Sequence, residues 1–267
     1  MTLDFLAPDL VPFHHLDGVG VFLLILIYGA TAVIRGAFGF GAITPAVLFS
    51  TLVTEPHHAV LLALCAGVIT QVQMIPFGLR HGDWKIAKPM IAAGFAAIAV
   101  GLLIFKKIEA GWLMILLGVV LAGVMVMDRY HVLDRLARKF DLRNMATAFG
   151  LSTTAGLIAG IAGGGGMYFY SVYLKLVCPT PALMRGTSIL LGSIFLYWRF
   201  IIAIIVGLIS FRLLIESLLL APASWFGAWI GIRFFHRADT SRFYGAFQLV
   251  LVVGAGALLW KGFDRVL

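Results

Sequence analysis

An apolar run at 19–53 is interrupted near its middle by Gly36-Ala-Phe-Gly39-Phe-Gly41, and this break constrains the fold more than any other feature. As one helix the run would be about 50 Å long, whereas the hydrocarbon core of a bilayer is roughly 30 Å thick. Each glycine inside a helix also costs about 0.5–1 kcal/mol relative to alanine. We therefore expect two half-helices, at 19–35 and 40–53, which either pass straight through a membrane or fold back as a re-entrant hairpin.

The break recurs once, at 160–166, where five of seven residues are glycine. An offset of 125 positions carries Gly39, Gly41, Pro56 and Gly67 onto a residue of the same type. Four glycine or proline matches at one offset indicate a duplicated unit.

Composition places the chain in a membrane, because 61% of its residues are hydrophobic and only 12% are charged. The net charge of +8 is then expected to mark cytoplasmic loops, so we expect no nucleic-acid partner. The first 18 residues hold three aspartates and neither lysine nor arginine, which excludes the basic region of a signal peptide there.

The predicted fold is an all-α polytopic membrane protein in the cell inner membrane. An extracytoplasmic N-terminus covers 1–18, and an amphipathic cytoplasmic linker at 128–144 joins two repeats. The first repeat, 19–127, holds the broken hairpin 19–53 and spans at 57–78, 86–105 and 111–127. The second, 145–263, holds the broken hairpin 145–177 and spans at 183–207, 212–232 and 243–262.

Loop charge favours hairpins over straight passages. With both broken segments as hairpins, 13 basic residues face the cytoplasm and 5 face outside, leaving Arg35 and Arg199 within the membrane. If both segments pass straight through, 11 basic residues face the cytoplasm and 7 face outside, which agrees less well with the positive-inside rule. A hairpin plus three spans crosses an odd number of times, so the two repeats would be inverted, as in many transporters.

The two breaks predict an anion site. The second half-helices would begin near Phe40 and Gly166, with their unpaired N–H groups and positive dipole ends inside the membrane. Close helix packing is the alternative role for these glycines. Arg35 beside the first break and Arg199 inside a span could neutralise a small anion, although Arg35 could instead stabilise a helix end and Arg199 could snorkel.

Neutral side chains complete the expected substrate site, although each could equally form interhelical hydrogen bonds. The predicted substrate-binding set is Arg35, Phe38, Gly39, Phe40, Gly41, Gln71, Gly163, Gly164, Gly165, Gly166, Thr187, Ser188 and Arg199. Glu216 lies one helical turn after Arg212, which predicts an interfacial ion pair, with a proton carrier as the alternative. No zinc spacing, nucleotide-binding loop or catalytic set is present, so we expect no enzyme, metal or cofactor.

The second glycine cluster reads Gly156-Leu-Ile-Ala-Gly160-Ile-Ala-Gly163-Gly164-Gly165-Gly166, and Pro181-Ala-Leu-Met-Arg185-Gly-Thr-Ser follows it. The first copy reads Arg35-Gly-Ala-Phe-Gly39-Phe-Gly41-Ala-Ile-Thr-Pro45, with Pro56 and Ala59 after it. Over about 20–263 this order resembles the TauE/SafE sulfite exporter family of permeases. The chain departs from the family pattern at Phe40, where glycine is common, and at Tyr170, where proline is expected.

The resemblance implies a secondary transporter that moves sulfite, a sulfonate or sulfoacetate, coupled to a proton or ion gradient. An anion channel of the same fold and a transporter of another small organic anion are the alternatives, while a membrane enzyme or receptor finds less support in the sequence. We leave open a homodimer, the direction of transport and the coupling ion.

Overall fold

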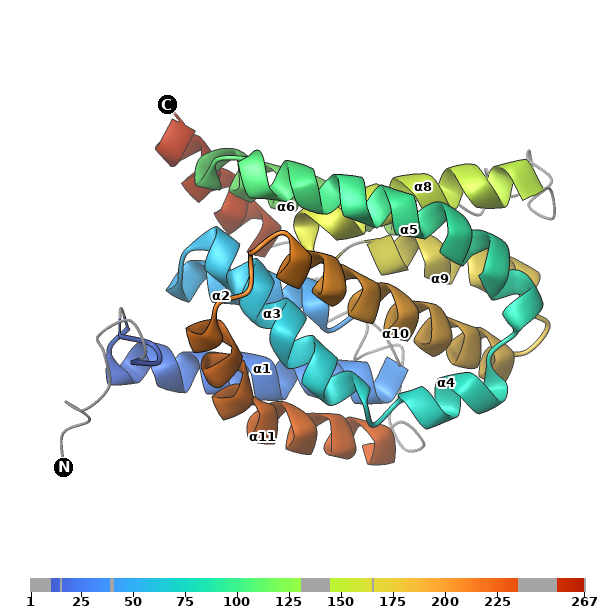
Figure 1. Cartoon of the computed structure of the whole chain (residues 1–267), viewed down its shortest axis with the longest axis horizontal. Coiled ribbons are helices and arrows are strands. Elements are labelled where there is room, and N and C mark those ends of the chain that lie inside the picture. The colour runs from blue at the N-terminus through green and yellow to red at the C-terminus, as the bar shows by residue number, and fades with distance from the viewer. Residues whose placement is uncertain are drawn as a thin grey trace.

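The computed structural model describes residues 11–14, 16–38, 41–130, 145–164, 166–234 and 254–266. All regular secondary structure within these residues is helical (Figure 1). The helices are α1 (Gly18–Phe38), α2 (Ile43–Val53), α3 (Pro56–Gln71), α4 (Ile75–His81), α5 (Trp84–Lys107), α6 (Ala110–Arg129), α8 (Met145–Ala162), α9 (Gly166–Val177), α10 (Pro181–Ile205), α11 (Phe211–Phe234) and a C-terminal helix at 254–266.

Five of the described helices are long and apolar enough to cross a membrane, and a sixth span forms if α3 and α4 are counted as one. Large apolar side chains such as Phe22, Trp112 and Phe226 are exposed on the outer faces of these helices. A bilayer would cover such surfaces, so the chain is a multi-pass membrane protein. The expected span at 57–78 is divided, because α3 and α4 meet at an angle of 67°.

Both expected breaks are present, with gaps between α1 and α2 and between α8 and α9. Gly41 and Gly163 lie in these gaps with φ of 91° and 75°, a left-handed conformation that glycine adopts without steric cost. The first helix of the first pair is longer than expected: α1 has 21 residues, enough to cross a bilayer unaided. Gly39, Phe40 and Gly165 lie outside the described residues.

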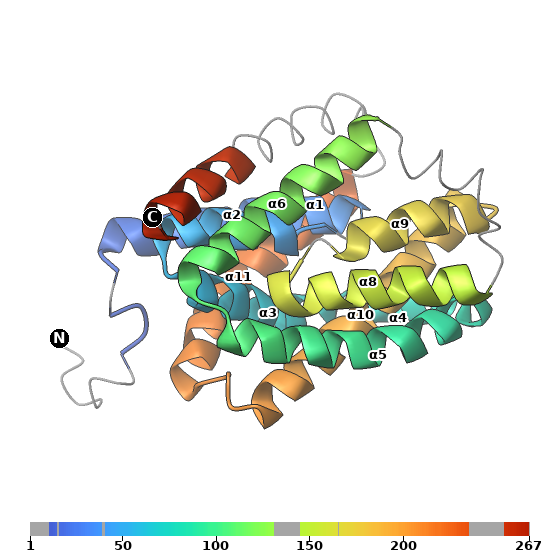
Figure 2. The same ribbon diagram turned by 90° about the horizontal axis from the view of Figure 1, so that it is seen from above.

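The two broken pairs begin at opposite ends of the molecule. In Figures 1 and 2, α1 leaves the end that carries the N-terminus and α2 returns to it, whereas α8 and α9 leave and return at the other end. Most of the linker expected at 128–144 and much of the span expected at 243–262 lie outside the described residues.

Glycines form two close helix contacts, each between the first helix of one broken pair and a helix of the other half. We call these two contacts the α5–α8 seam and the α1–α11 seam. In the α5–α8 seam, a Cβ on Gly160 would lie 2.6 Å from the Ile98 carbonyl oxygen and 2.8 Å from Gly101 Cα. In the α1–α11 seam, a Cβ on Gly231 would lie 2.9 Å from the Ala37 nitrogen. Small residues let helix backbones approach this closely, which drives helix association in lipid.

Candidate anion site

The two glycine breaks meet inside the molecule. Thr44 is in the first turn of α2, and Gly164 precedes α9. A Cβ on Gly164 would lie 2.5 Å from Thr44 Oγ1 and 3.0 Å from the Thr44 nitrogen, so no other residue fits at 164 without movement. No side chain caps the N-terminus of α2, which begins at this contact.

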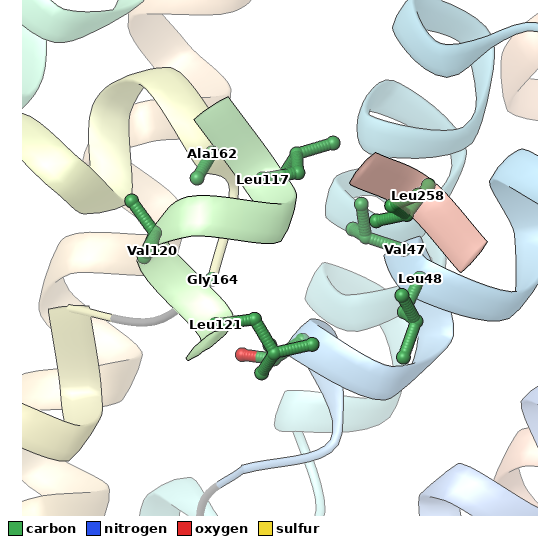
Figure 3. A pocket seen from close by; sticks show the side chains of 9 residues that line it. Val47, Leu48, Leu117, Val120, Leu121, Ala162, Gly164 and Leu258 are labelled. Atoms are coloured by element: carbon green, nitrogen blue, oxygen red, sulfur yellow. The ribbon is translucent and has the colours of Figure 1, made fainter. Parts of the chain in front are cut away.

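A small, mainly apolar hollow adjoins this contact (Figure 3). Its lining residues are Thr44, Val47, Leu48, Leu117, Val120, Leu121, Ala162, Gly164 and Leu258. Thr44 brings the one polar side chain among them, so this hollow does not suit a charge.

Arg35 lies near the end of α1 and is 6% exposed. Its Nη1 donates to the Gly67 carbonyl at 3.2 Å and to Thr70 Oγ1 at 2.8 Å, and its Nη2 donates to Gln71 Oε1. Gln71 in turn donates from Nε2 to Ser193 Oγ on α10 at 2.7 Å. A continuous hydrogen-bond network therefore holds the end of α1 to α3 and α10.

A second hollow, more polar than the first, lies between Arg35 and the first break. Thr31, Thr70 and Ser224 line it together with Ala42 and Ile43, which flank the start of α2. Ser224 Oγ is buried and has no hydrogen-bond partner among the described residues. The site thus combines a cation with a free hydroxyl.

Arg199, on α10, lies beside the second break and is 3% exposed. Its Nη2 donates to the Gly160 carbonyl at 3.2 Å, in the last turn of α8. Its Nε and Nη1 are buried without a hydrogen-bond partner among the described residues. A Cβ on Gly163 would lie 3.0 Å from Arg199 Nη1, so glycine is what allows the guanidinium to reach this turn.

Neither buried arginine forms an ion pair with a described residue. Burying an unpaired charge is costly, and so are buried donors without an acceptor. Two such cations beside two adjoining helix breaks therefore form a region in which a small anion would be stabilised.

The other predicted site residues lie at different distances from this region. Gln71 belongs to the Arg35 network. Thr187 is 12 residues before Arg199 on α10, about 18 Å along the helix, and accepts a hydrogen bond from the Asp83 backbone at the α4–α5 loop. Ser188 is buried beside it in sequence, with no partner for its hydroxyl among the described residues. The structure thus does not bring these two hydroxyls to Arg199.

Gly166 begins α9 and packs closely against α8, where a Cβ would lie 2.9 Å from Ala159 Cβ. Phe38 ends α1, and its side chain is outside the described residues, as are Gly39, Phe40 and Gly165. Sequence reasoning missed Thr44, Thr70 and Ser224. Two of these could have been found from the sequence, because Thr44 closely follows the first break and Thr70 is adjacent to the predicted site residue Gln71.

A comparison with protein-family models identifies the chain. The model for the sulfite exporter TauE/SafE family matches residues 21–258 of 267. The chain belongs to the TauE/SafE family. Searches of curated proteins and of solved structures gave no match. The TauE/SafE match covers both breaks and both buried arginines. The family is described as sulfite exporters, which are membrane transporters of a sulfur-containing anion.

Proposed function

We propose that the protein is a secondary transporter that moves a small organosulfur anion, such as sulfite, a sulfonate or sulfoacetate, across the cytoplasmic membrane. Family membership supports the substrate class. The observation that carries the proposal is Arg199, whose Nε and Nη1 are buried without a partner among the described residues beside the Gly163 turn.

The anion binds where the two breaks meet. Sulfite and sulfonates present several oxygen atoms, which accept hydrogen bonds from a guanidinium. Nε and Nη1 of Arg199 each offer an unpaired N–H donor, while Arg35 contributes positive potential from the polar hollow. The organic part of a sulfonate lies toward the apolar side chains of Leu117 and Leu121, which move apart to admit it.

Transport follows from an inverted-repeat architecture. Two broken helix pairs that begin at opposite ends of the molecule support it. The glycine contacts α5–α8 and α1–α11 support it too, because each joins the first helix of one broken pair to a helix of the other half. In such folds the substrate binds near the bilayer midplane, and one unit moves against the other to expose the site alternately. The N-terminus then lies outside the cytoplasm, in agreement with Arg80, Lys85 and Lys88 around the α4–α5 connection at the opposite end.

The membrane potential sets the need for coupling. A negative cell interior opposes the inward movement of an anion by about 2.3 kcal/mol per charge at 100 mV. Uptake therefore requires a proton or another co-transported cation, whereas export of the same anion is driven by the potential.

Thermal unfolding of the purified protein with sulfite, sulfate, methanesulfonate, sulfoacetate, acetate and phosphate tests the proposal. A ligand at 100 times its Kd stabilises by about 2.7 kcal/mol. We expect a shift with sulfite or sulfonates that Arg199→Gln removes and the control Arg265→Gln retains, since Arg265 forms an exposed ion pair with Glu55. An equal shift in wild type and Arg199→Gln would contradict this site.

A second measurement separates a transporter from a channel. Proteoliposomes loaded with unlabelled anion should take up labelled anion by counterflow, with saturable kinetics. Conductance that rises linearly with concentration and gives no counterflow would identify a channel instead.

A further inference from the structure

A buried carboxylate lies apart from the anion site, at the end of the molecule that carries the N-terminus. Glu216, in the second turn of α11, is 0% exposed and is the only buried acidic residue among those described. Its Oε2 lies 2.8 Å from His58 Nε2, and its Oε1 accepts a hydrogen bond from the Phe13 backbone at 2.9 Å. Arg212 Nε lies 3.6 Å from Oε1.

This carboxylate joins three segments that are distant in sequence. His58 begins α3, Glu216 and Arg212 begin α11, and Phe13 belongs to the segment before α1. The Phe13 side chain is 5% exposed within the apolar core, and its φ of 53° shows that the backbone is held in an uncommon conformation. Arg212 also contacts His14 Nδ1 at 3.0 Å, so the N-terminal segment is held at two points.

The other titratable groups near these elements have separate partners. Glu55 forms an exposed ion pair with Arg265, and Asp17 accepts a hydrogen bond from the Gly20 backbone. The His57 ring lies 5.0 Å from the Phe105 ring, and Lys106 donates to the Val206 carbonyl. Among the described residues, the charged and titratable groups that face Glu216 are therefore His58 and Arg212, with His14 behind Arg212.

We propose that Glu216 is the proton-binding site of the transport cycle, and that its protonation opens the N-terminal end of the molecule. His58, whose side chain is 17% exposed, is the group through which a proton from the water outside reaches Oε2. For a proton carried with the anion, the carboxylate ionises again in the state that is open to the cell interior, and the proton leaves on that side. This coupling role rests on the proposed transport function.

Charge explains why protonation would open this end. The ionised carboxylate attracts His58 and Arg212 and accepts a hydrogen bond from the Phe13 N–H, and hydrogen bonds to charged groups are about twice as strong as neutral ones. Neutralising Glu216 weakens its attraction for Arg212 and weakens the hydrogen bond from the Phe13 N–H, which keeps a neutral acceptor oxygen. The loosened contact joins α11 to α3, and α3 carries Thr70 and Gln71, which hold Arg35. The proton site and the anion site therefore share one helix.

Infrared difference spectroscopy tests proton binding without any substrate. Lipid-reconstituted protein is titrated with acid, and the C=O band of a buried protonated carboxylic acid is followed. We expect such a band in wild type, its loss in Glu216→Gln, its displacement along the pH axis in His58→Gln, and its retention in the control Glu55→Gln. Glu216→Gln retains an acceptor oxygen for Phe13, so the fold is expected to persist. A wild-type spectrum without a buried acid band, or one unchanged by Glu216→Gln, would overturn the proposal.

Proteoliposome transport of methanesulfonate, which stays a monoanion over this pH range, tests coupling. One proton carried with a monoanion gives about tenfold accumulation per pH unit. We expect Glu216→Gln to lose this accumulation and keep counterflow, while Glu55→Gln keeps both. Undiminished accumulation by Glu216→Gln would overturn the coupling role. Absent counterflow in wild type would instead contradict the proposed transport of sulfonates, and the infrared result would stand independently.

Discussion

Thr44 and Gly164 are in contact although 120 positions separate them, and this contact joins the two glycine breaks. The first turn of α2 and the residues before α9 are close because position 164 has no side chain. The breaks therefore form one structure, with a buried arginine near each side.

Gly164→Ala should separate the two breaks. The added Cβ would meet Thr44 at its nitrogen, Cα and Oγ1, and overpacking of this kind costs about 1–3 kcal/mol. We expect a lower midpoint of thermal unfolding and loss of anion counterflow. Gly150→Ala is the control, because nothing lies within 4 Å of a Cβ there. Equal behaviour of the two variants would show that the contact is not required.

Gly160→Ala should disrupt the α5–α8 seam. Its Cβ would meet the backbone at Ile98 and Gly101, which cannot move aside as a flexible side chain can. We expect destabilisation, measured by thermal unfolding in detergent. Gly150→Ala on the same helix should instead stabilise by about 0.5–1 kcal/mol, because alanine favours helix. A stabilising effect of Gly160→Ala would mean that α5 and α8 lie further apart.

Arg35→Ala and Arg199→Ala should differ in stability. Removing Arg35 leaves the buried oxygens of Thr70 and Gln71 without their donor, at about 1–3 kcal/mol per unsatisfied group. Removing Arg199 eliminates two unpaired buried donors, so the ligand-free protein should unfold at an unchanged or higher temperature. Both variants should bind the anion weakly. Greater destabilisation by Arg199→Ala would show that Arg199 has structural partners.

Gln71→Leu should interrupt the network between Arg35 and Ser193 without removing a charge. We expect KM for the anion to rise, because Nη2 of Arg35 loses its acceptor and the guanidinium is positioned less firmly. Gln73→Leu, two residues away, is the matched control, since Gln73 Nε2 has no hydrogen-bond partner among the described residues. An identical KM in both variants would remove Gln71 from the positioning of Arg35.

The all-helical membrane fold and the family could be predicted, because apolar runs and the glycines that interrupt them stand at recognisable positions in the sequence. The bend between α3 and α4 was harder to predict. Pro76 disfavours helical backbone in the residue before it, but a single proline within a long hydrophobic run does not by itself indicate a bend. The different surroundings of Arg35 and Arg199 could not be predicted. Each depends on the residues that α3 or α8 places beside it, and hydropathy does not encode these pairings.

The surroundings of Glu216 likewise depend on contacts between distant segments, which the sequence does not reveal. Its neighbour Arg212 was predictable from helical spacing, whereas His58 and the Phe13 backbone come from segments that are more than 150 residues away. Burial of the carboxylate results from these distant contacts, so local sequence indicated only an interfacial pair.

The α1–α11 seam also affects how the protein is made. About 170 residues separate the end of α1 from the start of α11, whereas α5 and α8 are about 40 residues apart. At a synthesis rate of roughly 5–20 residues per second, α1 waits about 10–35 s for its partner. During that interval its glycine face, which later contacts α11, is exposed to lipid or to the insertion machinery. A helix that is made early therefore reaches this partner late.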